Sequence, residues 1–160
     1  MPRVDFDKAP VTRGSDYPAP LDAEFSDRTR RRLGDAVGLT TVGVNFTTLP
    51  PGCRSALRHW HEVEDEMVYV LSGVLTLIED AGETEIKAGE AAGFPGGDAN
   101  GHCFENRSAE PVTMLEIGTR PKTDRCHYPD HDLVAHDHDG LTEYRRRDGS
   151  PLTPTKTRFE

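Results

Sequence analysis

The sequence predicts an all-β fold, either a sandwich or a barrel, and two observations carry this prediction. Residues 39–120 hold seven or eight short segments that are rich in β-branched and aromatic residues, separated by glycine or proline turns every eight to twelve residues. The same region contains no long amphipathic helical pattern and no internal repeat.

The predicted strands follow one another with short turns between them. In residues 39–49, Val42, Val44 and Phe46 alternate with small and polar residues, which is the period of a strand, and prolines 50 and 51 end it. A hairpin turn is expected at residues 79–82. The further strands are expected at residues 66–71, 74–78, 84–87, 90–94, 101–106 and 112–117.

The two ends of the chain have a different pattern. Four prolines in residues 1–20 indicate an extended arm, and the charged residues 21–35 have room for one turn of helix. After residue 120 the strand pattern weakens. The expected organisation is therefore an N-terminal arm (1–38), a barrel (39–120) and a C-terminal extension (121–160) that lies over the barrel and ends in a frayed segment.

Composition limits the function. A net charge of −9 argues against a nucleic-acid partner, and the basic runs at residues 28–32 and 145–147 are interpreted as solvated surface. The three cysteines contain no CxxC pair and predict no disulfide framework. No apolar signal region or membrane span is found, so we expect a soluble, cytoplasmic protein without a membrane partner.

The segment RHWHEVEDE, residues 58–66, indicates a metal site. His59 and His61 are two residues apart, so their side chains share a face in a strand but diverge by about 200° in a helix. An anionic oxygen is needed beside them, and residues 62–65 suit an exposed bend. Periodicity leaves the carboxylate open among Glu62, Glu64, Asp65 and Glu66.

A third histidine supports the same site. His102 shares one face of a late strand with Phe104 and Asn106, and the glycine-rich residues 89–101 allow a tight turn before it. Asn106 is interpreted as a structural hydrogen-bonding residue, and Cys103, on the opposite face, as a small buried one.

With these residues the chain resembles the cupin superfamily, over roughly residues 39–118. The first family motif, G(X)5HXH(X)3–4E(X)6G, matches Gly52, His59, His61, Glu66 and Gly73. The second, G(X)5PXG(X)2HX3N, matches Gly89, Pro95, Gly97, His102 and Asn106. The chain has six residues between Gly52 and His59 where the pattern has five, and four between Gly97 and His102 where it has two, and both additions fall in loops.

The resemblance implies a double-stranded antiparallel β-helix, a jelly-roll barrel, with N- and C-terminal extensions. It implies one divalent metal ion (iron, manganese, nickel or zinc) held by His59, His61, Glu66 and His102, with about two positions left for water or substrate. It also implies a homodimer in which the N-terminal arm or an edge strand pairs across the interface.

A second HxH pair, His136 and His138, occurs near the C-terminus. Aspartates and glycine around it predict a loop, so we interpret it as surface and not as a second metal site. His127 or His131 could close over the barrel as a lid.

Three functions remain open, because one ligand set serves many reactions. The first is a dioxygenase-like oxidoreductase acting on a small organic substrate, which suits an interior with few charged residues. The second is a sugar or sugar-phosphate isomerase, which needs basic residues for phosphate, and only Arg54 and Arg58 lie near the motif. The third is a non-catalytic module that binds a small ligand.

Overall fold

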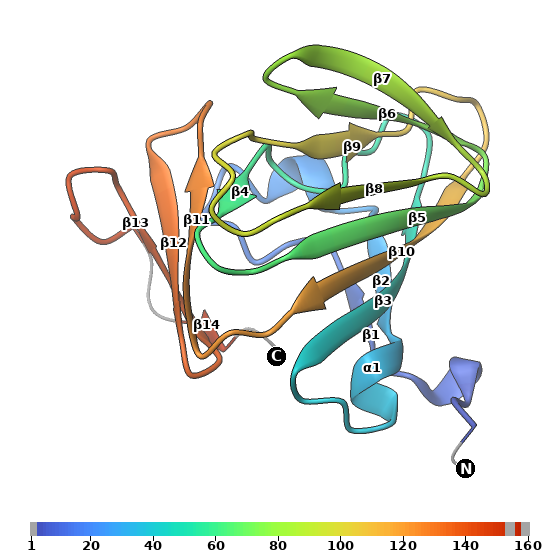
Figure 1. Cartoon of the computed structure of the whole chain (residues 1–160), viewed down its shortest axis with the longest axis horizontal. Coiled ribbons are helices and arrows are strands. Elements are labelled where there is room, and N and C mark those ends of the chain that lie inside the picture. Colours follow the sequence, from blue (N-terminus) through green and yellow to red (C-terminus); the bar gives the residue numbers. More distant parts are fainter. Residues whose placement is uncertain (1–2, 153–155, 158–160) are drawn as a thin grey trace.

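The fold is an antiparallel β-barrel, as the sequence predicts. The computed structural model describes residues 3–152 and the backbone of residues 156 and 157, and its strands form three sheets (Figure 1). The largest sheet runs in the order β1 (Val11–Arg13), β2 (Thr29–Arg32), β3 (Val42–Leu49), β10 (Val112–Thr119), β5 (Glu66–Ser72) and β8 (Ala91–Phe94). The smallest consists of β7 (Gly82–Lys87), β6 (Val74–Glu79) and β9 (Cys103–Glu105).

The third sheet stands at one side of the barrel. Its order is β14 (Lys156–Thr157), β13 (Leu141–Arg145), β12 (Leu133–His138), β11 (Thr123–Tyr128) and β4 (Trp60–His61). Helical structure in the described part of the chain is limited to the short elements η1 (Phe6–Lys8), η2 (Ala23–Phe25) and α1 (Leu33–Ala36). None of these is long and apolar enough to cross a membrane.

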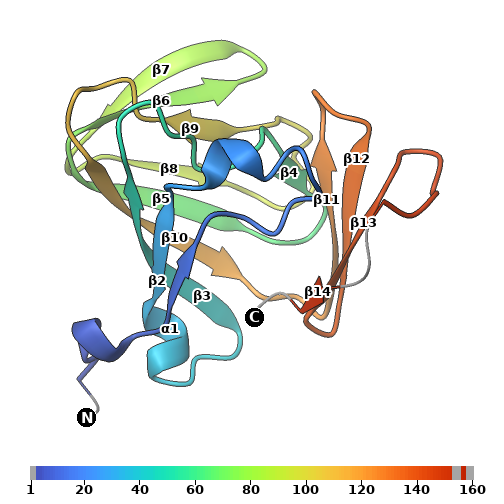
Figure 2. The ribbon, with the colours of Figure 1, turned by 180° about the vertical axis from the view of Figure 1, so that it is seen from behind.

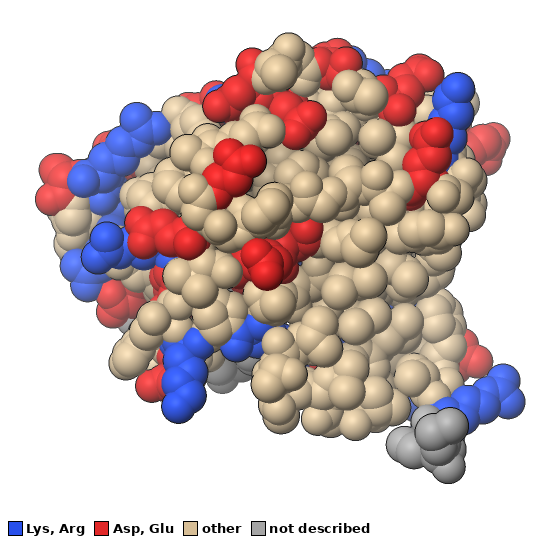
Figure 3. Space-filling view, viewed as in Figure 1, with Lys and Arg blue, Asp and Glu red and all other residues tan. Residues whose placement is uncertain are grey.

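The barrel core follows the strand alternation expected for β5. Val68 and Val70 are buried in a cluster with residues of β6 and β10, whereas Met67, Tyr69 and Leu71 on the opposite face are exposed. The exposed residues belong to a broad uncharged surface over β5 and β10 (Figure 3). This alternation directs Glu66, two residues before Val68, toward the interior.

The N-terminal arm is part of the fold. β1 pairs with β2, and β2 pairs with β3 of the same chain, with Thr29 opposite Thr48. Between β1 and β2 the chain crosses the back of the molecule to the C-terminal sheet (Figure 2). There the ring of Tyr17 makes edge contacts with Phe25, Tyr128 and Tyr144. The arm strands thus pair within one chain, and a homodimer stays a prediction.

The C-terminal segment contains more regular structure than its sequence suggests. The loop predicted around His136 and His138 is strand β12, which pairs with β11 and β13. β11 in turn pairs with β4, with Cys126 opposite His61. This part of the chain therefore forms one wall of the interior beside the predicted metal ligands. The predicted frayed end lies partly outside the described residues.

Candidate metal centre

The structure brings together the four residues predicted as metal ligands. His59 directly precedes β4 and His61 ends it, Glu66 begins β5, and His102 directly precedes β9. Backbone hydrogen bonds in both directions, 2.8 and 3.0 Å long, join His59 and His102. These bonds fasten the two sequence motifs to each other, so the side chains of both reach one point inside the barrel.

The ligand atoms have the spacing that a bound metal ion needs. One oxygen of Glu66, Oε2, lies 3.1 Å from Nε2 of His102, 3.3 Å from Nε2 of His59 and 3.6 Å from Nε2 of His61. Ligands bound at about 2.1 Å from a metal stand roughly 3.0–3.5 Å from one another. Oε2 of Glu66 therefore lies at ligand spacing from all three imidazoles, and the ligand atoms of His59, Glu66 and His102 also lie within 4.8 Å of one another, which suits a divalent ion.

Hydrogen bonds orient two of the imidazole rings. Nδ1 of His59 donates to the carbonyl of Leu57 at 2.8 Å, and Nδ1 of His61 donates to Oδ2 of Asp124 at 2.5 Å. Because these bonds hold a proton on Nδ1, Nε2 is the ring nitrogen that faces Glu66 and that can bind a metal once its own proton is lost. Asp124 also accepts the backbone N–H of Val63.

Stacking orients the third ring. The ring of Phe94 lies parallel to that of His102, with centroids 3.5 Å apart. Nδ1 of His102 is buried and has no hydrogen-bond partner among the described residues. Packing against Phe94 therefore restrains the ring orientation of His102, whereas hydrogen bonds to a carbonyl and a carboxylate restrain the rings of the other two histidines.

Electrostatics keep Glu66 ionised. Burial alone would raise its pKa, but hydrogen bonds from His102 and His59 outweigh burial and hold the pKa well below its usual range. For His61, burial lowers the pKa, while Cys126 and Asp124 raise it to a net value well above the usual one. Glu66 thus offers an ionised carboxylate to a cation, and a metal that binds His61 must displace the proton that its raised pKa retains.

The carboxylates of residues 62–66 have separate roles. Glu62 and Asp65 are exposed, as expected for a bend, and Glu66 faces the histidines. Glu64 was expected on the same exposed bend, and that expectation is wrong: its side chain is buried. The reason is a close approach to β10, because the Glu64 carboxylate occupies the space that a Cβ on Gly118 would take.

The predicted ligands open onto a cavity of about 560 Å³. The prediction of an interior with few charges is wrong, since acidic and basic side chains line this cavity together with the histidines. The interpretation of residues 28–32 as solvated surface is also wrong for alternate positions, namely Arg28, Arg30 and Arg32. Arg30 and Arg32 lie on β2 and Arg28 directly precedes it, so that period two directs all three to one face.

The cavity arginines differ in their partners. Arg30 forms a two-point ion pair with Glu116, at 2.6 and 3.1 Å. Arg28 is buried and donates to the carbonyls of Gly14 and Ser55, with no carboxylate at ion-pair distance among the described residues. Burial, together with the charge of Arg30, lowers the pKa of Arg28 to about 10, so it remains charged at neutral pH.

Sequence reasoning missed the wall formed by β11. Asp124, Cys126 and Tyr128 are buried on one face of this strand, while Thr123 and Arg125 are exposed on the other. Asp124 reaches His61, and the Tyr128 ring lies 6.0 Å from that of His59. The signal was present, because TDRCHY alternates, but its polar residues masked the strand.

Other residues singled out from the sequence have structural roles. Asn106 is buried, and its amide donates to the carbonyls of Leu49 and Glu110, as interpreted. His138 is exposed, and neither it nor His136 belongs to a group of possible metal ligands in the described part of the chain. His127 stacks on Trp60 and bonds to Glu62 on the outer side of the sheet.

Comparison with known proteins agrees with this architecture. Residues 45–118 match the family model described as a cupin domain. A cupin-superfamily sugar phosphate isomerase from Silicibacter pomeroyi is 44% identical, over 95% of this chain and 97% of its own, with a TM-score of 0.91. The chain belongs to the cupin superfamily. No curated protein sequence matches it.

Two further solved structures are informative at different levels. A putative sugar phosphate isomerase from Acidithiobacillus ferrooxidans is 32% identical, over 79% of this chain and 81% of its own, with a TM-score of 0.71. The polyketide cyclase RemF from Streptomyces resistomycificus is 23% identical, over 74% of this chain and 79% of its own, with a TM-score of 0.59, and shows the fold alone. The comparisons favour the isomerase alternative and give no support to the dioxygenase expectation.

Proposed function

We propose that this protein is a metal-dependent sugar-phosphate isomerase. The observation that carries the proposal is the buried charge of Arg28 in the same cavity as the His–Glu cluster. A buried cation without a carboxylate partner favours an anionic ligand, and a phosphate group supplies one. The likeness to two proteins described as sugar phosphate isomerases supports the same substrate class.

The metal would be held by the cluster described above. Three imidazole nitrogens around one carboxylate oxygen suit a divalent first-row ion. Such an ion would polarise a carbonyl or hydroxyl oxygen of the sugar as a Lewis acid. The cavity is lined by side chains from several strands, and these would position the substrate beside the ion.

Isomerisation between an aldose and a ketose moves one proton between neighbouring carbon atoms. A carboxylate must accept the proton from the first carbon and return it to the second. We assign this role to Glu64, which is buried, lines the cavity and has an oxygen within 4.8 Å of a ligand atom of His61. Glu66 is less suited because three imidazoles surround it.

The phosphate would bind where the arm meets β2. Arg28 holds the carbonyl of Gly14, and the neighbouring Ser15 has a buried hydroxyl without a hydrogen-bond partner among the described residues. Both residues line the cavity. A guanidinium and a hydroxyl donor side by side are suited to a phosphate oxygen pair.

The decisive experiment is an isomerisation assay without oxygen. Metal-loaded protein is incubated in D₂O with aldose and ketose phosphates and with the same sugars lacking phosphate, and deuterium incorporation is followed by NMR. We expect incorporation with a phosphorylated sugar, its loss in Glu64→Gln, and a several-fold higher KM in Ser15→Ala. In a parallel incubation under air, oxygen uptake with an oxidised product would instead establish the dioxygenase function.

A binding module would give a different result. A sugar phosphate would then raise the melting temperature without any exchange of deuterium, in wild type and in Glu64→Gln alike. Glu64→Gln distinguishes the two functions, because it removes the charge of one cavity carboxylate and nearly preserves its shape.

A further inference from the structure

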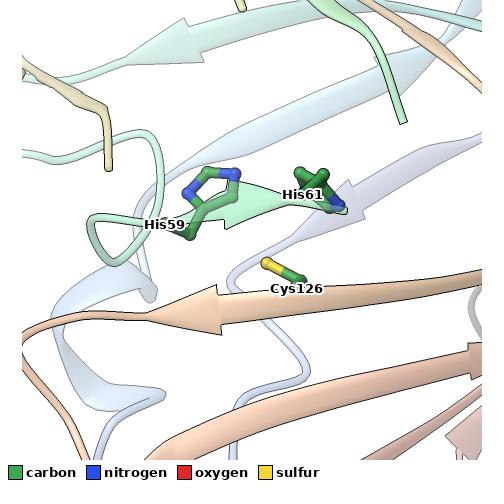
Figure 4. A group of neighbouring side chains, drawn as sticks. All are labelled: His59, His61 and Cys126. Atoms are coloured by element: carbon green, nitrogen blue, oxygen red, sulfur yellow. The ribbon is translucent and has the colours of Figure 1, made fainter. Parts of the chain in front are cut away.

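A second group of metal-binding atoms shares two histidines with the first. Ligand atoms of His59, His61 and Cys126 all lie within 4.8 Å of one another. Figure 4 shows the Cys126 sulfur pointing from β11 toward the histidines on the neighbouring strand. Cys126 lines the same cavity and is only 3% exposed.

Strand register explains why the sulfur faces the histidines. Cys126 is directly opposite His61 in the antiparallel pairing of β11 with β4, so both side chains leave the sheet on one face. Its neighbours on that face, Asp124 and Tyr128, contact His61 and His59. Cys126 thus lies between two residues that already engage the histidines, which fixes its position across the sheet.

The two groups of ligand atoms differ in chemical softness. Glu66 and His102 form a set of nitrogen and oxygen donors with His59, and Nε2 of His61 lies 3.6 Å from Oε2 of Glu66; this set suits manganese or iron. Cys126 completes a set of two nitrogens and one sulfur, which suits zinc, cadmium or copper(I) because a thiolate binds soft ions tightly. Since both sets need His59 and His61, they cannot be filled independently.

We propose that the centre has two alternative metal positions, and that Cys126 is the ligand that captures zinc or cadmium in the second one. Binding there transfers the thiol proton of Cys126 to solvent and leaves a metal–sulfur bond. A thiophilic ion would engage His59 and His61 and so displace the ion used for isomerisation. The proposal rests on the proposed metal centre but not on the identity of the substrate.

Cadmium titration of metal-free protein tests it, because cadmium bound to a thiolate absorbs in the ultraviolet. We expect the charge-transfer band in wild type and in Cys103→Ser, a control for another buried cysteine, and its loss in Cys126→Ser. Cadmium affinity should fall at least about tenfold in Cys126→Ser, or about 1.4 kcal/mol. Glu66→Gln should retain the band but lose manganese binding, measured by electron paramagnetic resonance.

A second measurement uses unmodified protein, because Cys126 also packs in a cluster with Tyr17 and Leu57 and its variant could fail to fold. X-ray absorption of the zinc-loaded wild type should show one sulfur at about 2.3 Å. Zinc with only nitrogen and oxygen neighbours, or an unchanged cadmium affinity in Cys126→Ser, would overturn the proposal. If zinc is bound to sulfur but no sugar phosphate incorporates deuterium in the isomerisation assay, the isomerase function is contradicted and the Cys126 site is not.

Discussion

Nδ1 of His61 donates a hydrogen bond to Oδ2 of Asp124, and the 2.5 Å between these atoms joins β4 to a strand more than sixty residues further along the chain. Asp124 is not a metal ligand in our assignment. It fixes the tautomer of His61 and the direction of Nε2 toward Glu66. The quality of the metal site therefore depends on a residue of the C-terminal sheet.

Replacement of Asp124 by Asn should weaken metal binding. The amide cannot provide the negative charge that raises the basicity of His61, so manganese affinity should fall about 10- to 100-fold. Isothermal titration calorimetry measures it. Asp130→Asn is the control, because Asp130 pairs with Arg58 away from the cavity. Equal affinities in the two variants would show that Asp124 does not support the site.

The carboxylate of Asp124 should make the stability of the fold depend on pH in the acid range. Burial would raise the pKa of Asp124, but the hydrogen bond and charge of His61 lower it below its usual value. A depressed pKa stabilises the fold above the unfolded value of about 3.9 and loses that effect as pH falls through the folded value. The difference in unfolding free energy between wild type and Asp124→Asn is measured with a chelator present, so that no metal is bound. This stability gap should be constant from about pH 6 to 5 and shrink below about pH 4.

Urea unfolding at each pH measures this gap. The range stays below about pH 6.5 so that the imidazole of an unfolded chain is protonated throughout. A gap that stays constant down to about pH 3 would contradict the ion pair between Asp124 and His61.

Gly118→Ala should displace the Glu64 carboxylate, because the new methyl group would occupy its position. We expect isomerase turnover to fall as in Glu64→Gln, with manganese affinity retained and stability lower by about 1–3 kcal/mol. Gly93→Ala is the matched control: it is also a strand glycine, but its Cβ would meet only an ordinary contact, 3.8 Å from the Glu66 carbonyl. Equal turnover in the two alanine variants would remove Glu64 from the proposed mechanism.

The pair of Arg30 and Glu116 should couple two strands of the barrel. Their side chains are 31% and 17% exposed, and Thr47 also donates to Glu116. Arg30→Gln alone leaves a partly buried carboxylate and should cost about 1–3 kcal/mol of unfolding free energy, less than a fully buried pair because water reaches the arginine. Glu116→Gln in the same protein should recover part of that loss. Urea unfolding of wild type, the two single variants and the double variant tests this. Additive losses of unfolding free energy would exclude the coupling.

The barrel strands were predictable because their information is local. The alternation around Val68 and Val70 requires only that one face is apolar, and the structure confirms it. The convergence of His59, His61, Glu66 and His102 was also expected, from the motifs that resemble a known family. Whether a metal binds there stays a prediction.

The sequence by itself thus determined the all-β class, the barrel strands and four candidate ligands. Only the tertiary structure decided the surroundings of these ligands. Arg28, directly before β2, is buried because it lines the cavity and bonds to the carbonyls of Gly14 and Ser55, although five charged or polar residues in a row look like surface. Cys126 meets His61 because β11 pairs with β4, and pairing between distant strands depends on register across the whole sheet, which no local pattern contains.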